Sequence, residues 1–408
     1  MKKVLFINSA VYLPGEGGYK RSMYLLDMMI RLGYSCTLLT SDFNHYTKTA
    51  RDIKKFREEF PQYNDFIELL HKIPYKKNIS ILRLYSDKRF ERTITKWFKD
   101  KGNEYDVVFI SDQEAVLTIN KIRKKKGIPL IIDIRDLFPE ALKVIFKHDI
   151  VYKCLTFLFK LHEDKCFACA DELVAVSKEY LDRGTAVNTK TRNSEVVYIG
   201  ATLEKFDQGI RKYSDGFVKK EGECWMAYAG TLGASYDLKT VIQACKKIKD
   251  HGINLVFKIL GQGPEENELK RYVQKIGAAN VEFLGFLEYA KMAALLSKCD
   301  ITVNCIKKNA SQSIINKVAD YFASGKPMLN SCQNEEMQML IEDYQTGMNY
   351  EAENVEDFIK KFMELYTDPE LRLKYGANAR RLALEKFDRV HSYKKIIGII
   401  EKASVKEI

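Results

Sequence analysis

Short apolar runs rich in β-branched residues recur along this chain of 408 residues, and most lead through a glycine-bearing loop into an amphipathic segment. Val4–Asn8 is followed by Gly15–Gly18, a helix expected over Arg21–Leu32 and a second strand at Ser35–Thr40. This order is a βαβ unit, which is typical of a parallel sheet with right-handed crossovers. Because the alternation restarts at Trp225–Ala229, we expect two α/β halves.

Two stretches of the first half do not follow this alternation. Residues 42–103 are charged and aromatic without a clear period, so we expect short helices and a mobile insertion there. Residues 140–170 predict a helical region that is unusually apolar, including Val144, Ile150 and Phe157. Core packing is the favoured interpretation of this region, and contact with lipid head groups beside neighbouring lysines is the alternative.

Composition and charge argue against a secreted, a membrane-spanning and a nucleic-acid-binding protein. The sequence begins with no signal-peptide pattern, and no run of about 18 apolar residues predicts a membrane span. Nine cysteines at irregular positions favour reduced thiols and a cytoplasmic chain. Residues 1–200 carry 35 Lys and Arg against 26 Asp and Glu, whereas residues 201–408 carry 31 against 29. The basic first half suits an anionic surface or substrate, and without a nucleic-acid-binding motif no nucleic acid partner is expected.

The stretch Gln312–Leu329 predicts a helix that ends at Ser324-Gly325 and leads into a buried strand at Met328-Leu329. At about 100° per residue, one helix face is apolar and the other gathers polar side chains, namely Gln312, Ser313, Asn316, Lys317 and Asp320. A purely structural surface helix has the same pattern. The glycine-marked strand ends before the helix favour a functional role.

Four glycine-bearing loops follow predicted strands, at Gly15–Gly18, Gly230–Gly233, Gly261–Gly263 and Gly285. In open parallel sheets, ligands bind beyond the carboxyl ends of the strands, where backbone N–H groups suit phosphate. No loop carries the complete Walker or dinucleotide pattern, and a tight turn alone explains a single glycine. Three such loops in one half, followed by a polar helix face, nevertheless predict an anion-binding site.

The motifs of the second half occur in a fixed order: Gly230-Thr231-Leu232-Gly233, Gly261-Gln262-Gly263-Pro264, VEFLGF over 281–286, and Asn316-Lys317-Val318-Ala319-Asp320 with Gly325-Lys326-Pro327. Together they resemble the donor domain of retaining GT-B glycosyltransferases of family 4. Residues 133–140 read DIRDLFPE, similar to the D-x-R-D-L-W-P-E signature of the bacterial surface-polysaccharide (O-antigen and capsule) branch. The resemblance covers essentially the whole chain.

This resemblance implies an α/β GT-B fold with two doubly wound, Rossmann-like domains facing a central cleft. The implied acceptor-binding domain spans residues 1–203 together with a C-terminal crossover helix in 389–408. The implied nucleotide-sugar donor-binding domain spans residues 204–388. A polar passage at about Thr202–Glu223 is expected to link them.

The resemblance also implies roles for three residues of the helix. Asp320 takes the place of the carboxylate that holds the donor ribose hydroxyls, and Lys317 matches the lysine that neutralises the donor diphosphate. Gln312 stands where a glutamate of the family meets the sugar, and its amide can still hydrogen-bond a hydroxyl. These three are the implied catalytic residues.

Other implied donor contacts are distributed over both halves. The Gly17-Gly18 loop is expected to approach the phosphates, and Gly285 with Phe286 lies where the family's backbone meets the base. The further residues implied at the donor are Gly230, Thr231, Gly261, Gly263, Ser313 and Asn316, and those implied on the acceptor side are Arg135, Asp136, Glu140 and Asp112.

The implied reaction is transfer, with retention and without an enzyme nucleophile, of a hexosyl or N-acetylhexosaminyl group. The donor is a nucleotide-diphosphate sugar, with UDP expected, and the acceptor is a glycan or an undecaprenyl-diphosphate-linked sugar in lipopolysaccharide or capsule assembly. No cofactor or metal is expected. Peripheral contact with an anionic membrane is expected. Thr231 and Tyr236 replace the family's Arg and Lys, and its acceptor-side His is missing. A nucleotide-sugar 2-epimerase and a non-catalytic nucleotide-sugar-binding partner therefore remain as alternatives.

Overall fold

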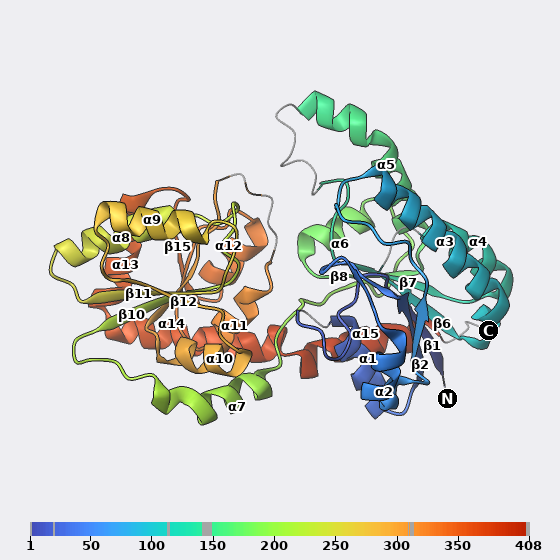
Figure 1. Ribbon diagram of the computed structural model, residues 1–408, viewed down its shortest axis with the longest axis horizontal. Coiled ribbons are helices and arrows are strands. Elements are labelled where there is room, and N and C mark those ends of the chain that lie inside the picture. Colours follow the sequence, from blue (N-terminus) through green and yellow to red (C-terminus); the bar gives the residue numbers. More distant parts are fainter. Residues whose placement is uncertain are drawn as a thin grey trace. The chain divides into compact units, whose positions relative to one another are not determined.

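The computed structural model describes residues 2–18, 21–111, 115–140, 149–308, 310 and 314–404 (Figure 1). The chain divides into two compact units, Met1–Val197 with Tyr393–Ile408, and Tyr198–Ser392. The sequence predicts these boundaries at 203 and 389. Tyr198 lies in the second unit, where its ring stacks on Phe387 at 4.5 Å and its hydroxyl donates to Glu336 Oε1 at 2.6 Å.

The first unit contains a seven-stranded sheet in the order β5-β2-β1-β6-β7-β8-β9. Every neighbouring pair of strands in it is parallel. The strands are β1 (Lys3–Ile7), β2 (Ser35–Ser41), β5 (Ile67–Leu70), β6 (Val107–Ile110), β7 (Leu130–Ile134), β8 (Glu172–Ala175) and β9 (Glu195–Val196). The helices are α1 (Arg21–Arg31), α2 (Ile53–Glu59), α3 (Ile81–Lys101), α4 (Val116–Lys126), α5 (Asp149–Cys169), α6 (Lys178–Thr185) and most of α15 (Arg389–Ala403), and β3 (Phe43–Asn44) pairs with β4 (Thr49–Ala50).

Helices cover both faces of this sheet, so its central strands are buried runs of Val, Ile and Leu. One core cluster joins α1 and α15 to the sheet through side chains such as Leu26 and Ile396. The other joins α3, α4 and α5 through Phe90, Ile119 and Phe167. The chain therefore returns to its first unit at the end.

The second unit contains a six-stranded parallel sheet in the order β12-β11-β10-β13-β14-β15. Its strands are β10 (Cys224–Ala229), β11 (Leu255–Leu260), β12 (Val281–Gly285), β13 (Ile301–Asn304), β14 (Met328–Asn330) and β15 (Gly347–Asn349). Its helices are α7 (Leu203–Tyr213), α8 (Leu238–Asp250), α9 (Glu266–Ile276), α10 (Tyr289–Lys298), α11 (Lys317–Ala323), α12 (Glu335–Glu342), α13 (Val355–Thr367) and α14 (Pro369–Leu382). The two predicted doubly wound halves are confirmed.

Four expectations about local structure are wrong. Residues 42–103 contain the sheet strand β5 and the 21-residue helix α3, which buries Phe90, Ile94 and Phe98. The expected linker at 202–223 contains α7. The large aliphatic and Phe side chains of α5 between Ile150 and Leu161 are exposed instead of packed in the core, and Val144 lies outside the described residues. Finally, α11 begins at Lys317 and not at Gln312, although it ends as predicted before Gly325, which has φ +65°.

Candidate active site

Three glycine loops lie side by side at the carboxyl ends of β10, β11 and β12, because their backbones bond to one another. Gly230 N donates to Leu260 O at 2.8 Å, Leu232 N to Gln262 O at 3.0 Å, and Gly261 N to Gly285 O at 2.7 Å. These three amides already donate hydrogen bonds within the protein and are not available to a ligand. In the same loops the amides of Thr231, Gly233, Gln262 and Gly263 have no hydrogen-bond partner among the described residues.

Gly261 and Gly263 allow two neighbouring loops to approach closely. A Cβ at Gly261 would lie 2.8 Å from the carbonyl carbon of Gly230, and one at Gly263 would lie 2.6 Å from that of Leu232. Real side chains do not tolerate such contacts. These two glycines are thus required by backbone packing, whatever the loop binds.

Lys317 reaches the loop after β10 from the first residue of α11. Its ammonium donates to the Tyr228 hydroxyl at 2.7 Å and lies 4.2 Å from the centre of the Tyr228 ring and 3.7 Å from that of Tyr236. The Tyr228 hydroxyl in turn donates to Thr231 O at 2.7 Å. A Cβ at Gly230 would lie 2.7 Å from Lys317 Cε, so glycine leaves the space that the lysine fills.

This environment makes Lys317 a titrating group near neutral pH. Burial lowers the pKa of its ammonium from 10.5 to about 7, and no carboxylate is among the groups that offset this shift. The two tyrosine rings offer a cation–π surface, which holds the ammonium without neutralising it. An anion beside Gly230 would therefore meet a positioned cation that has no carboxylate partner among the residues described.

Asp320 lies one turn further along α11 and is 8% exposed. Its Oδ1 accepts a hydrogen bond from the Tyr289 hydroxyl of α10 at 2.8 Å. Burial raises the pKa of this carboxyl from 3.8 to about 6, against the opposing effects of Tyr289 and the Arg389 charge. Above pH 6 the group is a carboxylate with a fixed orientation, suited to accept hydroxyl hydrogens.

The structure brings Lys317, Gly230, Thr231, Gly261 and Gly263 together, as the sequence predicts. At the end of β12, Gly285 has φ +65° and Phe286 is 73% exposed. Asn316 is the N-cap residue of α11, without a side-chain capping hydrogen bond to that helix. Gln312 and Ser313 lie outside the described residues.

In the first unit, the signature 133–140 begins with a buried ion pair. Arg21 donates to Asp133 through Nη2–Oδ1 at 2.8 Å and Nε–Oδ2 at 3.1 Å, and through Nη1 to Val197 O at 2.8 Å. Sequence analysis missed Arg21. Its signal is its position on the same helix face as Leu25 and Met28, both buried, where a charge needs a partner.

The implied acceptor residues divide into paired and exposed groups. Arg135 contacts Asp133 at 3.8 Å, and its Nε is buried without a hydrogen-bond partner in the described structure. Glu140 accepts from Arg183 Nε at 2.8 Å, which gives it a structural role in joining β7's loop to α6. Asp136 is exposed, and Asp112 lies outside the described residues.

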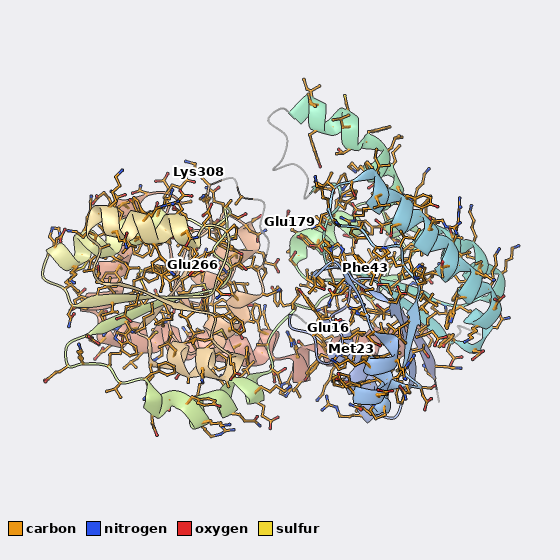
Figure 2. All side chains as sticks on the ribbon, viewed as in Figure 1. Glu16, Met23, Phe43, Glu179, Glu266 and Lys308 are labelled. Carbon is orange, nitrogen blue, oxygen red and sulfur yellow. The ribbon has the colours of Figure 1, made fainter. Side chains whose placement is uncertain are left out.

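The Gly17-Gly18 loop follows β1 and is anchored by its neighbour Glu16, which is labelled in Figure 2. Glu16 accepts from Leu13 N at 2.7 Å and forms two bonds with Arg51, at 2.8 and 2.9 Å. Gly18 has φ +106°, and a Cβ there would meet the Tyr12 ring, whereas Gly17 has open space around it. The loop is thus a built turn in which Gly17, unlike Gly18, has room for a side chain.

Residues 210–382 match the family model of glycosyl transferases group 1. This part of the chain is therefore similar to that family. It contains Lys317, Asp320 and the three glycine loops. The candidate site of the second unit therefore lies within the matched region. Among the described residues, no group of His, Cys, Asp and Glu side chains could hold a metal ion, and no helix is long and apolar enough to cross a membrane.

Known relatives extend the likeness beyond the group 1 domain. A glycosyltransferase of Methanocaldococcus jannaschii is 25% identical over 234 residues, which are 57% of this chain and 59% of the relative. The O-antigen chain mannosyltransferase C of Escherichia coli is 24% identical over 258 residues, 62% of this chain and 67% of that protein. The chain thus spans 59% of the archaeal relative's length.

Anabaena HepE in complex with UDP and glucose has a similar structure, with a TM-score of 0.66 and 15% identity over 98% of this chain and 100% of its own. At this identity the likeness shows the fold alone. The chain therefore has two Rossmann-like halves of the GT-B type, as predicted.

Proposed function

We propose that the chain is a retaining glycosyltransferase of family 4 that moves a hexosyl or N-acetylhexosaminyl group from a UDP-sugar to a glycan or lipid-linked acceptor in bacterial surface polysaccharide synthesis. The main observation behind this proposal is the position of the Lys317 ammonium, which lies against two tyrosine rings beside Gly230 in the region that matches the group 1 family model. The UDP and glucose bound to Anabaena HepE support the donor, and the E. coli O-antigen mannosyltransferase supports the acceptor class.

In this proposal, Lys317 stabilises the charge that grows on the leaving diphosphate. The bond between the sugar C1 and the phosphate oxygen breaks while the acceptor oxygen bonds to C1 on the same face, and the acceptor proton passes to the departing phosphate. Lys317 needs no reorganisation, because Tyr228 and Tyr236 already hold it, and the unbonded amides of Thr231 and Gln262 are further donors. Asp320, oriented by Tyr289, accepts the ribose hydroxyls.

Nucleotide binding is the first test. UDP and UDP-sugars should raise the melting temperature of the purified chain more than GDP, ADP or their sugars, because a ligand at 100 times its Kd stabilises by about 2.7 kcal/mol. Asp320→Ala should lose most of this shift, and Asp343→Ala, on an exposed residue after α12, should keep it. Release of UDP should then require an added glycan acceptor. No shift with any nucleotide at millimolar concentration contradicts the proposal.

Donor binding should also weaken as the pH rises from about 7 to 9. The free protein loses the Lys317 proton in this range, since burial lowers that pKa to about 7, whereas a bound diphosphate favours the ammonium. Binding then takes up a proton, and the apparent Kd rises by up to about tenfold per pH unit. Calorimetry with a UDP-sugar in two buffers of different ionisation enthalpy measures the uptake. A Kd that stays constant over this range, without proton uptake, contradicts the role of Lys317.

A further inference from the structure

Large apolar side chains are exposed at the starts of two helices of the first unit. In α5 they are Ile150, Val151, Leu155, Phe157, Leu158, Phe159 and Leu161, and around the start of α3 they are Ile79, Ile81, Leu82, Leu84 and Tyr85. The most exposed are Ile81 at 87%, Ile150 at 77% and Leu158 at 75%. We call these twelve side chains the apolar tip.

Topology places both parts of the apolar tip at one edge of the sheet. α3 leads into β6 and α5 leads into β8, so each helix starts at the carboxyl edge of the parallel strands. α4 packs between them on the same sheet face. α3 and α5 have 21 residues each, about 31 Å, whereas α4 has 11, about 16 Å. The first turns of α3 and α5 therefore extend past α4, and Figure 1 shows the start of α5 projecting from the unit.

The outward face of α5 is apolar over three turns. At 100° per residue, Ile150, Cys154, Phe157 and Leu161 fall on one line, opposite the buried Thr156 and Glu163. The helix buries one face on its own unit and exposes a second apolar face to water. An exposed apolar face of this size marks an interaction surface. Acidic side chains are absent from the outward arc between Ile150 and Leu161.

Basic side chains follow the apolar tip on α3 and flank it on α5. The outward face of α3 changes after Tyr85 to exposed cations, Lys88, Arg89, Arg92 and Lys96. On α5, Lys153 and Lys160 flank the apolar line. Apolar residues at the projecting end, with cations behind them on α3 and beside them on α5, match the acyl boundary and the anionic head groups of a lipid bilayer.

We infer that the apolar tip docks on an anionic lipid membrane, with the cations behind it at the level of the phosphates. The occupant is a bilayer and not a second copy of this chain, because pairing two tips would bring like-charged rows of lysine and arginine together. This inference is independent of the proposed sugar transfer. It places the carboxyl edge of the first sheet, where Arg135 and Asp136 follow β7, toward the membrane surface.

Vesicle flotation tests the inference with the full chain and no sugar substrate. Vesicles with about 30% phosphatidylglycerol in phosphatidylcholine should carry the protein, pure phosphatidylcholine should carry at least about tenfold less, and 1 M NaCl should release it. Ile81→Glu/Leu158→Glu should lower binding to anionic vesicles at least about tenfold. Both positions are exposed, so melting temperature should not change.

Leu32→Glu is the matched control. Leu32 is 57% exposed and follows α1 at the opposite edge of the same sheet, so this variant should bind vesicles like the original chain. Failure of the original chain to float, or flotation of Ile81→Glu/Leu158→Glu at the original level, overturns the inference. So does a dimer in light scattering that becomes monomeric in this double variant while vesicle binding is absent, because the tip is then an interface between copies.

Discussion

Lys317→Ala is expected to lower kcat/KM for sugar transfer by about 10²–10³-fold, the effect of removing one preorganised donor from a developing anion. The ammonium touches two tyrosine rings and one hydroxyl and, within the described part of the chain, no carboxylate, so its charge is available to a ligand. The nucleotide-induced melting shift should disappear in the same variant. Coupled detection of released UDP with a glycan acceptor measures the first effect.

Lys308→Ala is the control for this prediction. Lys308, labelled in Figure 2, also follows β13 at the carboxyl edge of the second sheet. Its side chain is 51% exposed and contacts Glu351 at 3.7 Å. Its loss should leave kcat/KM within about twofold. Equal losses in both variants would show that general charge, and not the position of Lys317, attracts the donor. An unchanged kcat/KM in Lys317→Ala would exclude the lysine from the reaction.

The architecture could be predicted because its signals are local. Runs such as Val107–Ile110 and Leu130–Ile134 are apolar throughout, as strands buried on both faces must be, and Gly325 ends α11 as its position predicts. The position of α3 was also present in the sequence, since Phe90, Ile94 and Phe98 recur every four residues. The many charged side chains between these residues of α3 made the period hard to recognise.

Other features depend on neighbours that are distant in sequence. The need for Gly261 and Gly263 comes from the backbones of Gly230 and Leu232, about 30 residues earlier, which no local pattern reveals. The sequence offers the exposed face of α5 only as the alternative, because apolar residues around most of a helix favour burial. The sequence predicts Lys317 as a site residue, whereas its contact with Tyr228 became visible only in the fold.

Arg21→Met is expected to destabilise the first unit by about 3–5 kcal/mol, because it leaves the Asp133 carboxylate buried without its partner. The two side chains are 4% and 2% exposed, and Arg21 also bonds to Val197 O. The chain has two tryptophans, Trp97 in the first unit and Trp225 in the second. Urea unfolding in a Trp225→Phe background therefore reports on the first unit alone.

Lys178→Ala removes an exposed ion pair with Asp182 in the same unit and should change the free energy of unfolding by less than about 0.5 kcal/mol. Arg21→Met/Asp133→Leu should recover part of the lost stability, since it removes both buried charges. A loss below about 1 kcal/mol in Arg21→Met would show that water or backbone solvates Asp133 instead. A third result, a destabilised unit with an unchanged kcat of the folded protein, would show that Asp133, the first residue of the DIRDLFPE signature, fixes the end of β7. Arg135 and Asp136 would then be the residues of the signature expected to contact the acceptor.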